Sequence, residues 1–380
     1  MPVLLRTIFF PQEWGIKGVD WLRHSLILKM KLPCASRWIW VSIAHEIPSG
    51  ILWQKRCQNV RILAMRIVFM GTPRFAIPTL KRLIASEHQI VGVFTRPDKP
   101  AGRGQQPAPP PVKLAAGENG LAVFQPKTLR DKAEIERLAG LEPDAIVLVA
   151  YGQMLPQAAL DIPKFGCLNI HPSLLPKYRG ASPIASAILA GDEETGVTIM
   201  LMNAGMDTGP ILSQKKVTID FRDTTETLES KLAEVGADLL METLPEWFAR
   251  RLTPQFQNEE AATYTRPISK GDGEIDWNLS AIELDRKIRA FYPWPGCYTR
   301  WQGKSLKILG AIALPLSVSV GDSVEPGQVV MLASEPETPV GVVTSEGILG
   351  LLRIQAEGRK AISAAEFLRG QRGIIGQRLG

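Results

Sequence analysis

The chain has 380 residues, of which 45% are hydrophobic and 22% are charged, and its formal net charge is +6. This length predicts two or three domains with a sizeable core, and no apolar run reaches the roughly 18 to 20 residues that a membrane-spanning helix needs. The four cysteines, Cys34, Cys57, Cys167 and Cys297, form no CxxC pair. Their spacing argues against a disulfide framework or a zinc site and favours a reducing compartment.

The first 64 residues carry all of the net basicity. They hold nine Lys or Arg and three Asp or Glu, whereas the rest of the chain holds 35 of each sign. They also contain five of the nine tryptophans, without a sustained helical or strand period. We expect residues 1–64 to be a leader that is not part of the fold. An upstream extension from a start assigned too early, an organelle-targeting peptide and an extra module all remain open as explanations.

From Met65 onward, short apolar runs alternate with amphipathic stretches, the pattern of a doubly wound, mostly parallel α/β sheet. We predict strands at 66–70, 89–95, 145–150, 167–170, 198–202 and 211–218. We predict helices at 75–86 and 224–251; the second begins at a Thr-x-x-Thr sequence and is ended by Pro254. This α/β domain covers residues 65–254.

A polar segment at 255–267 is predicted to be a linker, and the pattern changes after it. One helix at 280–291 is followed by short strands at 297–301, 306–313, 328–333, 340–344 and 349–355, separated by Gly and Pro turns. Five short strands of this kind predict a small β-barrel, similar to the oligonucleotide-binding (OB) type. The second domain therefore covers residues 268–380.

Several common kinds of site are not indicated. The turn after the first strand lacks GxGxxG, and the chain contains no GxxxxGK[ST] sequence, which argues against dinucleotide and P-loop sites. It has four histidines and no HExxH, so we expect no catalytic metal. A serine acyl-enzyme is not indicated either, because no GxSxG occurs.

The sequence CLNIHPSLLPKYRG at 167–180 carries the clearest functional signal. Asn169 and His171 lie two residues apart at the end of an apolar run, so in a strand their side chains share one face. Pro172 and Pro176 prevent the strand from continuing. Asp207, in NAGMDTGPIL, is a third polar residue flanked by glycines.

An amide, an imidazole and a carboxylate without a protein nucleophile suit acyl transfer to an amine, because the amine itself attacks. Asn169 can stabilise the tetrahedral oxyanion. His171 can act as general base or, when protonated, as a second donor to the same oxygen. Asp207 can orient the imidazole and raise its pKa. Taken singly, each residue is more often structural: a turn former, a core histidine or a helix N-cap.

The run NIHPSLLPKYRG and the later MDTGPIL resemble the signature of the folate-dependent formyltransferases. RIVFMGTPRFAIPTL, FTRPDKPAGRG, VLVAYGQMLP, GDEETGVTIM and IDWNLSAIELDRKIRAFYPWPG follow the order of that family. The resemblance covers Met65 to the C-terminus. It implies an enzyme that takes a formyl group from 10-formyltetrahydrofolate without a metal. Within the family, the chain most resembles members that formylate the α-amino group of methionine on initiator methionyl-tRNA for translation initiation.

The resemblance also assigns roles to single residues. Asn169, His171 and Asp207 match the catalytic trio of the family. The segment that lines the folate site corresponds to Ser173, Leu174, Leu175 and Pro176. The residues themselves agree, since two leucines before a proline turn suit a flat ring, although a loop that plugs the core would show the same pattern.

Arg103 matches an arginine that approaches the tRNA acceptor end in the family. It lies between two glycines in the proline-rich loop 95–111, where a guanidinium can reach phosphate or a splayed base. A solvated loop without a partner is the alternative. The second domain has 14 basic and 12 acidic residues from Arg266 onward, so a tRNA-binding face there requires clustering in space.

Two other functions remain open. A formyltransferase that acts on a small amine, such as an amino sugar or glycinamide ribonucleotide, would use the same trio. A nonenzymatic RNA-binding protein would keep the fold but lose Asn169, His171 or Asp207. We expect a monomer that does not contact membranes and works in the cytoplasm, or in an organelle only if residues 1–64 are a transit peptide.

Overall fold

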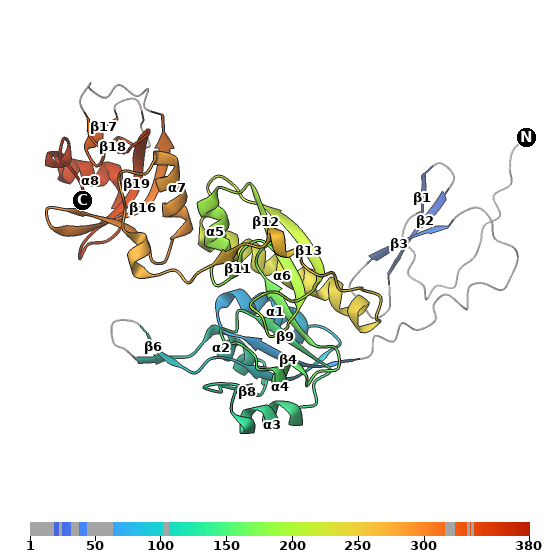
Figure 1. Ribbon diagram of the computed structural model, residues 1–380. Coiled ribbons are helices and arrows are strands. Elements are labelled where there is room, and N and C mark those ends of the chain that lie inside the picture. Colours follow the sequence, from blue (N-terminus) through green and yellow to red (C-terminus); the bar gives the residue numbers. More distant parts are fainter. Residues whose placement is uncertain are drawn as a thin grey trace, which may run out of the picture. The chain divides into compact units, whose positions relative to one another are not determined.

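The computed structural model describes residues 19–22, 25–31, 38–43, 64–101, 106–315, 324–332, 335 and 338–380. The chain divides into two compact units, Met1–Arg61 and Ile62–Gly380 (Figure 1). Among the described residues, no helix is long and apolar enough to cross a membrane.

The first unit contains three strands that the sequence pattern does not predict. They are β1 (Val19–Leu22), β2 (Ser25–Lys31) and β3 (Trp38–Ile43), and they form an antiparallel sheet in the order β1-β2-β3. Their sequences, VDWL, SLILKMK and WIWVSI, do not alternate strictly between apolar and polar residues, so the period of 2 that marks a strand is missing.

The second unit begins with a seven-stranded sheet in the order β13-β12-β10-β9-β4-β5-β8. Its strands are β4 (Arg66–Gly71), β5 (Gln89–Phe94), β8 (Val123–Phe124), β9 (Ala145–Val149), β10 (Cys167–His171), β12 (Glu194–Leu201) and β13 (Ile211–Thr218). The neighbours from β10 to β8 pair in parallel, whereas β12 and β13 are antiparallel. The predicted mostly parallel α/β sheet is confirmed.

Both faces of this sheet are covered, which explains why its central strands are continuously apolar. Ile67 and Phe69 of β4 belong to one apolar cluster, and Val68 and Met70 of the same strand belong to another. The first cluster includes side chains of α1 (Ile77–Ile84), α2 (Pro111–Glu118), α5 (Pro183–Ala190) and α6 (Thr225–Phe248). The second includes side chains of α3 (Lys132–Gly140) and α4 (Gln157–Leu160). Figure 1 shows α1 and α6 on one side of the sheet and α3 on the other.

Helix α6 begins where its sequence predicts. Thr224 accepts a hydrogen bond from the backbone N–H of Thr227, whose hydroxyl in turn accepts from the N–H of Thr224, as in a capping box. The predicted end is wrong, however: the helix stops at Phe248, and Pro245 lies inside its last turn. Pro254 therefore does not determine where the helix ends.

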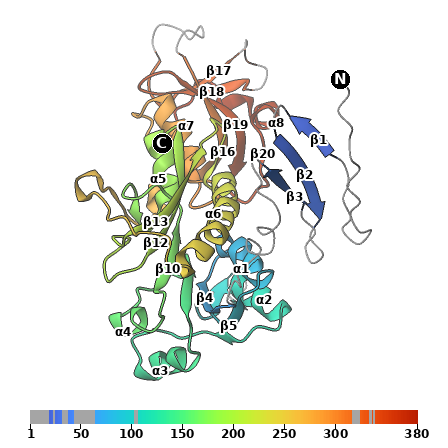
Figure 2. The same cartoon turned by 90° about the vertical axis from the view of Figure 1, so that its right-hand side faces the viewer.

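The remainder of the second unit is an antiparallel sheet in the order β15-β16-β19-β18-β17, with β20 beside β19. The strands are β15 (Cys297–Trp301), β16 (Lys304–Leu314), β17 (Val329–Met331), β18 (Val340–Val343), β19 (Ile348–Ala356) and β20 (Ile362–Ser363). A bulge at Gly310 of β16 bends the sheet, so that it curls into a half-barrel. This is consistent with the predicted OB-like fold, and all five predicted strands are present. Figure 2 shows β16 to β19 beside α7 (Ala281–Ala290).

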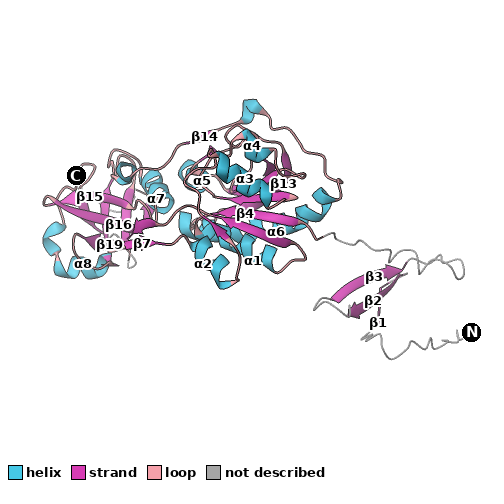
Figure 3. Cartoon of the chain, turned by 90° about the horizontal axis from the view of Figure 1, so that it is seen from below, coloured by secondary structure: helices cyan, strands magenta, loops and turns pink. Residues whose placement is uncertain are grey.

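Several elements lie outside the predicted set. The proline-rich loop contains a hairpin of β6 (Lys99–Ala101) and β7 (Gln106–Ala108), and α8 (Ala364–Gly370) follows β20. The predicted linker contains the short helix η3 (Glu259–Ala261) and β14 (Tyr264–Thr265), which pairs in parallel with β11 (Arg179–Gly180). Figure 3 labels β14 at the α/β domain. The linker therefore contributes to the structure around residues 178–180.

Candidate active site

Strand β10 brings Asn169 and His171 to the carboxyl end of the parallel strands. Asn169 lies opposite Leu148 of β9. His171, the last residue of β10, lies opposite Thr198 of β12. Residues two apart in a strand share a face, so the amide and the imidazole lie on the same side of the sheet. Pro172 follows directly and the chain leaves the sheet.

The loop after β10 holds the imidazole of His171, which is 4% exposed. Its Nε2 atom lies 3.0 Å from the carbonyl oxygen of Tyr178. Because a carbonyl can only accept, we assign the proton of the neutral ring to Nε2. Nδ1 then carries a lone pair, and the Oδ2 atom of Asp207 lies 3.7 Å from it. The nitrogen that can accept a proton therefore lies on the side of Asp207.

Burial lowers the pKa of His171 below its ordinary value of 6.5. The carboxylate of Asp207 and the hydrogen bond to Tyr178 act in the opposite direction, but they are outweighed. From the sequence alone, we expect Asp207 to raise the pKa of His171. Asp207 does act in that direction, but the net shift is downward, because the loss of water around a buried imidazole cannot be read from sequence spacing. His171 is neutral at pH 7 and can serve as a base.

This direction predicts the pH dependence of catalysis. A base with a lowered pKa keeps its lone pair to lower pH, so His171 should add a fall in kcat/KM only below pH 6.5. This fall is separate from the one caused by protonation of the attacking amine, since an α-amino group has an ordinary pKa of about 7.7 to 8.0. The measurement is kcat/KM across pH at constant ionic strength, because salt screens the interactions between charged groups. An acid limb centred above pH 6.5 that disappears when the imidazole is removed would contradict a His171 base with a lowered pKa.

Asp207 lies on the loop between β12 and β13, and hydrogen bonds from two other segments hold it in place. Its Oδ2 atom accepts a hydrogen bond of 2.8 Å from the N–H of Gly180. Its carbonyl accepts one of 2.8 Å from Nε2 of Gln257. Its φ of 52° lies in the left-handed region, which Asp tolerates better than most residues but which surrounding contacts must maintain. The carboxylate is thus fixed beside Nδ1 of His171.

Asn169 is half-buried, and among the residues that the structure describes its amide has no hydrogen-bond partner. An amide held on a rigid strand but not engaged by the protein is free to donate to a ligand. The structure therefore brings His171 and Asp207 into contact and places Asn169 two residues away on the same strand.

The four residues predicted to line a folate site have different surroundings. The hydroxyl of Ser173, which is fully buried, donates to the carbonyl of Lys177 at 2.6 Å. Leu175 is 3% exposed and its N–H donates to Thr198, and the carbonyl of Pro176 accepts from the linker. The side chain of Leu174, which is half-buried, lines a pocket. The segment is thus a loop held by internal hydrogen bonds, with the side chain of Leu174 at a pocket.

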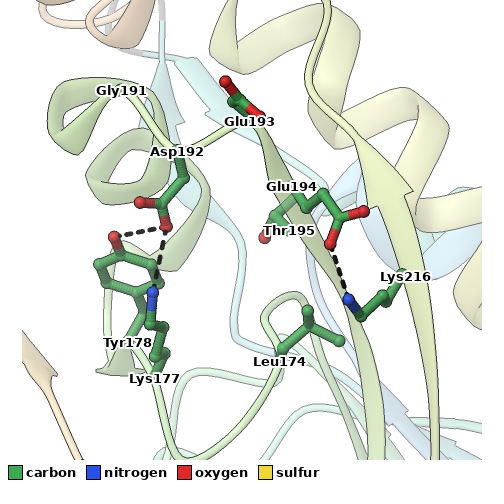
Figure 4. A pocket seen from close by; sticks show the side chains of 9 residues that line it. All are labelled: Leu174, Lys177, Tyr178, Gly191, Asp192, Glu193, Glu194, Thr195 and Lys216. Atoms are coloured by element: carbon green, nitrogen blue, oxygen red, sulfur yellow. Dashed lines mark hydrogen bonds and ion pairs between the residues drawn. The ribbon is translucent and has the colours of Figure 1, made fainter.

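The pocket beside Leu174 has a volume of about 550 Å³. Figure 4 shows the Tyr178 hydroxyl, which donates to Asp192 at 2.8 Å, on one side, and Glu194, paired with Lys216 at 2.8 Å, on the other. Burial, together with Asp192, raises the pKa of Tyr178, so this hydroxyl stays protonated. With three carboxylates against two ammonium groups, the pocket does not suit an anionic group, whereas Leu174 suits an apolar ring.

A second group of polar residues, which the sequence analysis did not single out, follows the ends of β5 and β9. Thr95 Oγ1, Arg96 Nε and Tyr151 Oη are buried and lack hydrogen-bond partners among the described residues. Burial raises the pKa of Tyr151 to about 12. Ligands of open α/β sheets bind at the carboxyl ends of the strands, and unpaired buried polar groups are costly unless something satisfies them. The available signal was that Thr95 and Tyr151 directly follow apolar runs and that Arg96 comes next after Thr95.

Two expectations concern groups that the structure does not place in this site. Arg103 lies outside the described residues, within the connection between β6 and β7. Among the described residues, no group of three or more His, Cys, Asp or Glu side chains could hold a metal ion. Cys167 and Cys297 are free and buried.

Two family models match the chain. The one described as "Formyl transferase" matches residues 65–244. The one described as "Formyl transferase, C-terminal domain" matches residues 267–372. Together they cover both domains of the second unit.

The chain is also similar to curated proteins of bacteria. It is 47% identical over 316 residues to a methionyl-tRNA formyltransferase of Dehalococcoides mccartyi, covering 83% of this chain and 99% of that protein. It is 46% identical over 316 residues to the methionyl-tRNA formyltransferase of Methylococcus capsulatus, covering 83% and 100%.

Solved structures share the fold at low identity. HypX from Aquifex aeolicus in complex with tetrahydrofolic acid has a TM-score of 0.55 and 19% identity, over 82% of this chain and 48% of that one. The chain thus spans about half the length of HypX. An N-formyltransferase from Helicobacter canadensis, in complex with folinic acid and dTDP-3-aminofucose, has a TM-score of 0.53 and 18% identity, over 77% and 98%. At such identities these likenesses show the fold alone.

Proposed function

The chain belongs to the formyl transferase family, and on that basis we propose that it transfers the formyl group of 10-formyltetrahydrofolate to the α-amino group of methionine on initiator methionyl-tRNA. The observation that carries this function is the match to methionyl-tRNA formyltransferases along 83% of the chain and nearly their whole length. The match includes both domains. The reaction prepares the initiator tRNA for translation initiation.

The mechanism follows from the three side chains. When bound, the folate presents its formyl carbon to the methionine amine, which attacks it. Asn169 donates to the oxygen that becomes negative, and the benefit is large because this charge exists only during the reaction. His171 accepts the amine proton at Nδ1, while Nε2 stays bonded to the carbonyl of Tyr178. Asp207 stabilises the imidazolium that forms, 3.7 Å from its carboxylate. The proton can later pass to the leaving nitrogen.

The loop after β10 fits a folate at its apolar part. Leu174 offers a flat hydrophobic contact beside a pocket, while the internal hydrogen bonds of Ser173 and Leu175 hold the backbone in place. In this proposal Leu174 touches the co-substrate, and Ser173, Leu175 and Pro176 shape the loop that presents it. The unpaired polar atoms of Thr95, Arg96 and Tyr151 can satisfy donors and acceptors of either substrate.

The tRNA side of the proposal involves the second domain and the β6–β7 hairpin. We keep residues 65–254 as the catalytic domain, 268–380 as the tRNA-binding domain and 255–267 as the linker between them. Arg103 contacts the acceptor end in this proposal. Binding through phosphates would make the affinity fall steeply as salt rises. The enzyme acts as a monomer in this scheme, with one tRNA and one folate.

The direct test is to incubate the purified full chain with 10-formyltetrahydrofolate and one of three acceptors. We expect formylation of initiator methionyl-tRNA and none of glycinamide ribonucleotide or a nucleotide-linked amino sugar. The product is measured as formylmethionine released from the tRNA. Efficient transfer to a small amine with none to the tRNA would overturn the proposed substrate, and no transfer to any acceptor would favour a nonenzymatic RNA-binding protein.

A further inference from the structure

The guanidinium of Arg179, in β11, is fully buried, and among the described residues its hydrogen bonds all go to linker side chains. Nη1 and Nη2 donate to the two carboxylate oxygens of Glu259 at 2.8 and 2.7 Å, and Nη1 also donates to the hydroxyl of Tyr264 at 2.8 Å. Nε and Nη2 donate to Oε1 of Gln257 at 3.0 and 2.9 Å. All five N–H groups of the guanidinium are therefore satisfied. A buried charge with full pairing is costly to disturb, so Arg179 is a fixed anchor for the linker.

The side chain of Gln257 connects this anchor to the loop that carries Asp207. While its Oε1 accepts from Arg179, its Nε2 donates to the carbonyl of Asp207 at 2.8 Å and to that of Gly209 at 2.7 Å. Both hydrogens and the oxygen of the amide are thus in use. Gln257 is the only one of these residues that contacts Arg179 and the 207–209 backbone at once.

The backbone of the linker holds the same region from two sides. Gln255 and Ile211 exchange a pair of backbone hydrogen bonds of 2.8 Å at the start of β13. Thr263 accepts at Oγ1 from the N–H of Tyr178 at 2.7 Å, and its carbonyl accepts from the N–H of Arg179 at 2.8 Å. One end of the linker therefore holds the loop of Asp207, and the other holds the segment of Tyr178.

Tyr178 and Asp207, which the two ends of the linker hold, are the polar neighbours of His171. The carbonyl of Tyr178 receives Nε2, and the carboxylate of Asp207 lies beside Nδ1. Both residues have left-handed backbones, with φ of 61° and 52°, and such conformations persist only where surrounding contacts hold them. The linker supplies those contacts, although residues 255–266 lie between the two family matches.

We propose that the linker is part of the catalytic machinery, with Gln257 and Arg179 as positioning residues that hold Asp207 and Tyr178 on either side of His171. The inference rests on the proposed function and deepens it. The two residues touch neither substrate in this scheme. They act by holding the imidazole of His171 and the carboxylate of Asp207 in the positions that the reaction needs. A displacement of about 1 Å in such a site can cost on the order of 100-fold in rate.

The first test is Gln257→Met, which keeps the length of the side chain and removes both of its polar functions. We expect kcat for methionyl-tRNA to fall by about 10- to 100-fold, with the KM values of both substrates within about twofold. We also expect the pKa of His171, followed by NMR titration without substrates, to move further down. Asp207 is the charged group that raises it, and a looser Asp207 raises it less. Unchanged kcat, a loss confined to KM or an unmoved pKa would overturn the proposal.

Gln257→Glu separates the two contacts of the amide. A carboxylate still accepts from Arg179 but cannot donate to the carbonyls of Asp207 and Gly209, so we expect a loss of kcat as large as in Gln257→Met. The thermal unfolding midpoint of each variant shows whether the fold is kept. A Gln257→Glu enzyme with wild-type kcat would show that donation to the 207–209 loop is irrelevant, and would overturn the assignment.

Two acidic residues of the linker provide a matched pair for Arg179. Both side chains are exposed, but only that of Glu259 is paired with the buried guanidinium among the described residues. Glu259→Gln removes this paired charge, whereas Glu260→Gln removes the same charge one residue further on. We expect kcat to fall only in the first. Equal kcat in the two variants would show that Arg179 does not position the catalytic residues.

The NMR titration of His171 needs no acceptor substrate. If the enzyme failed to formylate methionyl-tRNA, the proposed function would be refuted, but the titration would still show whether Gln257 positions Asp207.

Discussion

Replacing His171 by Gln is expected to lower kcat by about 100- to 10,000-fold, the range for loss of a general base. The glutamine amide can still donate to the carbonyl of Tyr178, so the loop after β10 keeps its contact. It cannot accept a proton from the substrate amine at the place of Nδ1. Single-turnover formylation of methionyl-tRNA measures the chemical step. The part of the fall in rate below pH 6.5 that comes from the imidazole should disappear in this variant, whereas the part that comes from protonation of the substrate amine should remain.

His88 provides the control for this substitution. It is also buried, at 7% exposure, and burial also lowers its pKa. It directly precedes β5 and accepts from the N–H of Met65 at 3.4 Å, at the amino end of the parallel strands and away from Asn169. His88→Gln is expected to change stability but to leave kcat within about twofold. If His171→Gln kept kcat within about tenfold of the wild type, the proton would have another acceptor.

Replacing Asn169 by Ala should lower kcat by about 100-fold or more, since loss of one donor to an oxyanion costs roughly 2.7 to 4 kcal/mol. The effect should appear in kcat more than in KM, because the negative oxygen exists only in the transition state. Folding should change little, as the amide has no partner among the described residues. Steady-state kinetics and the thermal unfolding midpoint together check both statements.

Two further variants make the role of Asn169 specific. Asn169→Asp keeps the shape but replaces the donor by a negative charge, so it should lose at least as much activity as Asn169→Ala. Asn119→Ala removes an amide at the end of α2 that donates to the carbonyl of Ala115 at 2.8 Å, and kcat should not change. Near-normal turnover in Asn169→Ala would remove this residue from the mechanism.

Local patterns predicted the elements whose burial is strong and regular. The run 145–150 is apolar throughout, and β9 is buried at every position (Ala145–Val149). The alternation of short strands with Gly and Pro turns after residue 296 predicted β15 to β19. In contrast, α5 (Pro183–Ala190) was missed because its small apolar residues show no 3.6-residue period: the helix packs against both α7 and α6.

By itself, the sequence predicted six of the seven strands of a mostly parallel sheet, an OB-like domain after it and the residues of the candidate trio. Strand period placed Asn169 and His171 on one face, the flanking glycines singled out Asp207, and the family motifs matched all three. Only the tertiary structure decided which nitrogen of His171 carries the proton and in which direction its pKa shifts, because both depend on the carbonyl of Tyr178 and on burial. It alone showed that the linker holds the loop of Asp207. Gln257 and Asp207 are 50 residues apart in the chain, and no local pattern reports a contact between residues so distant.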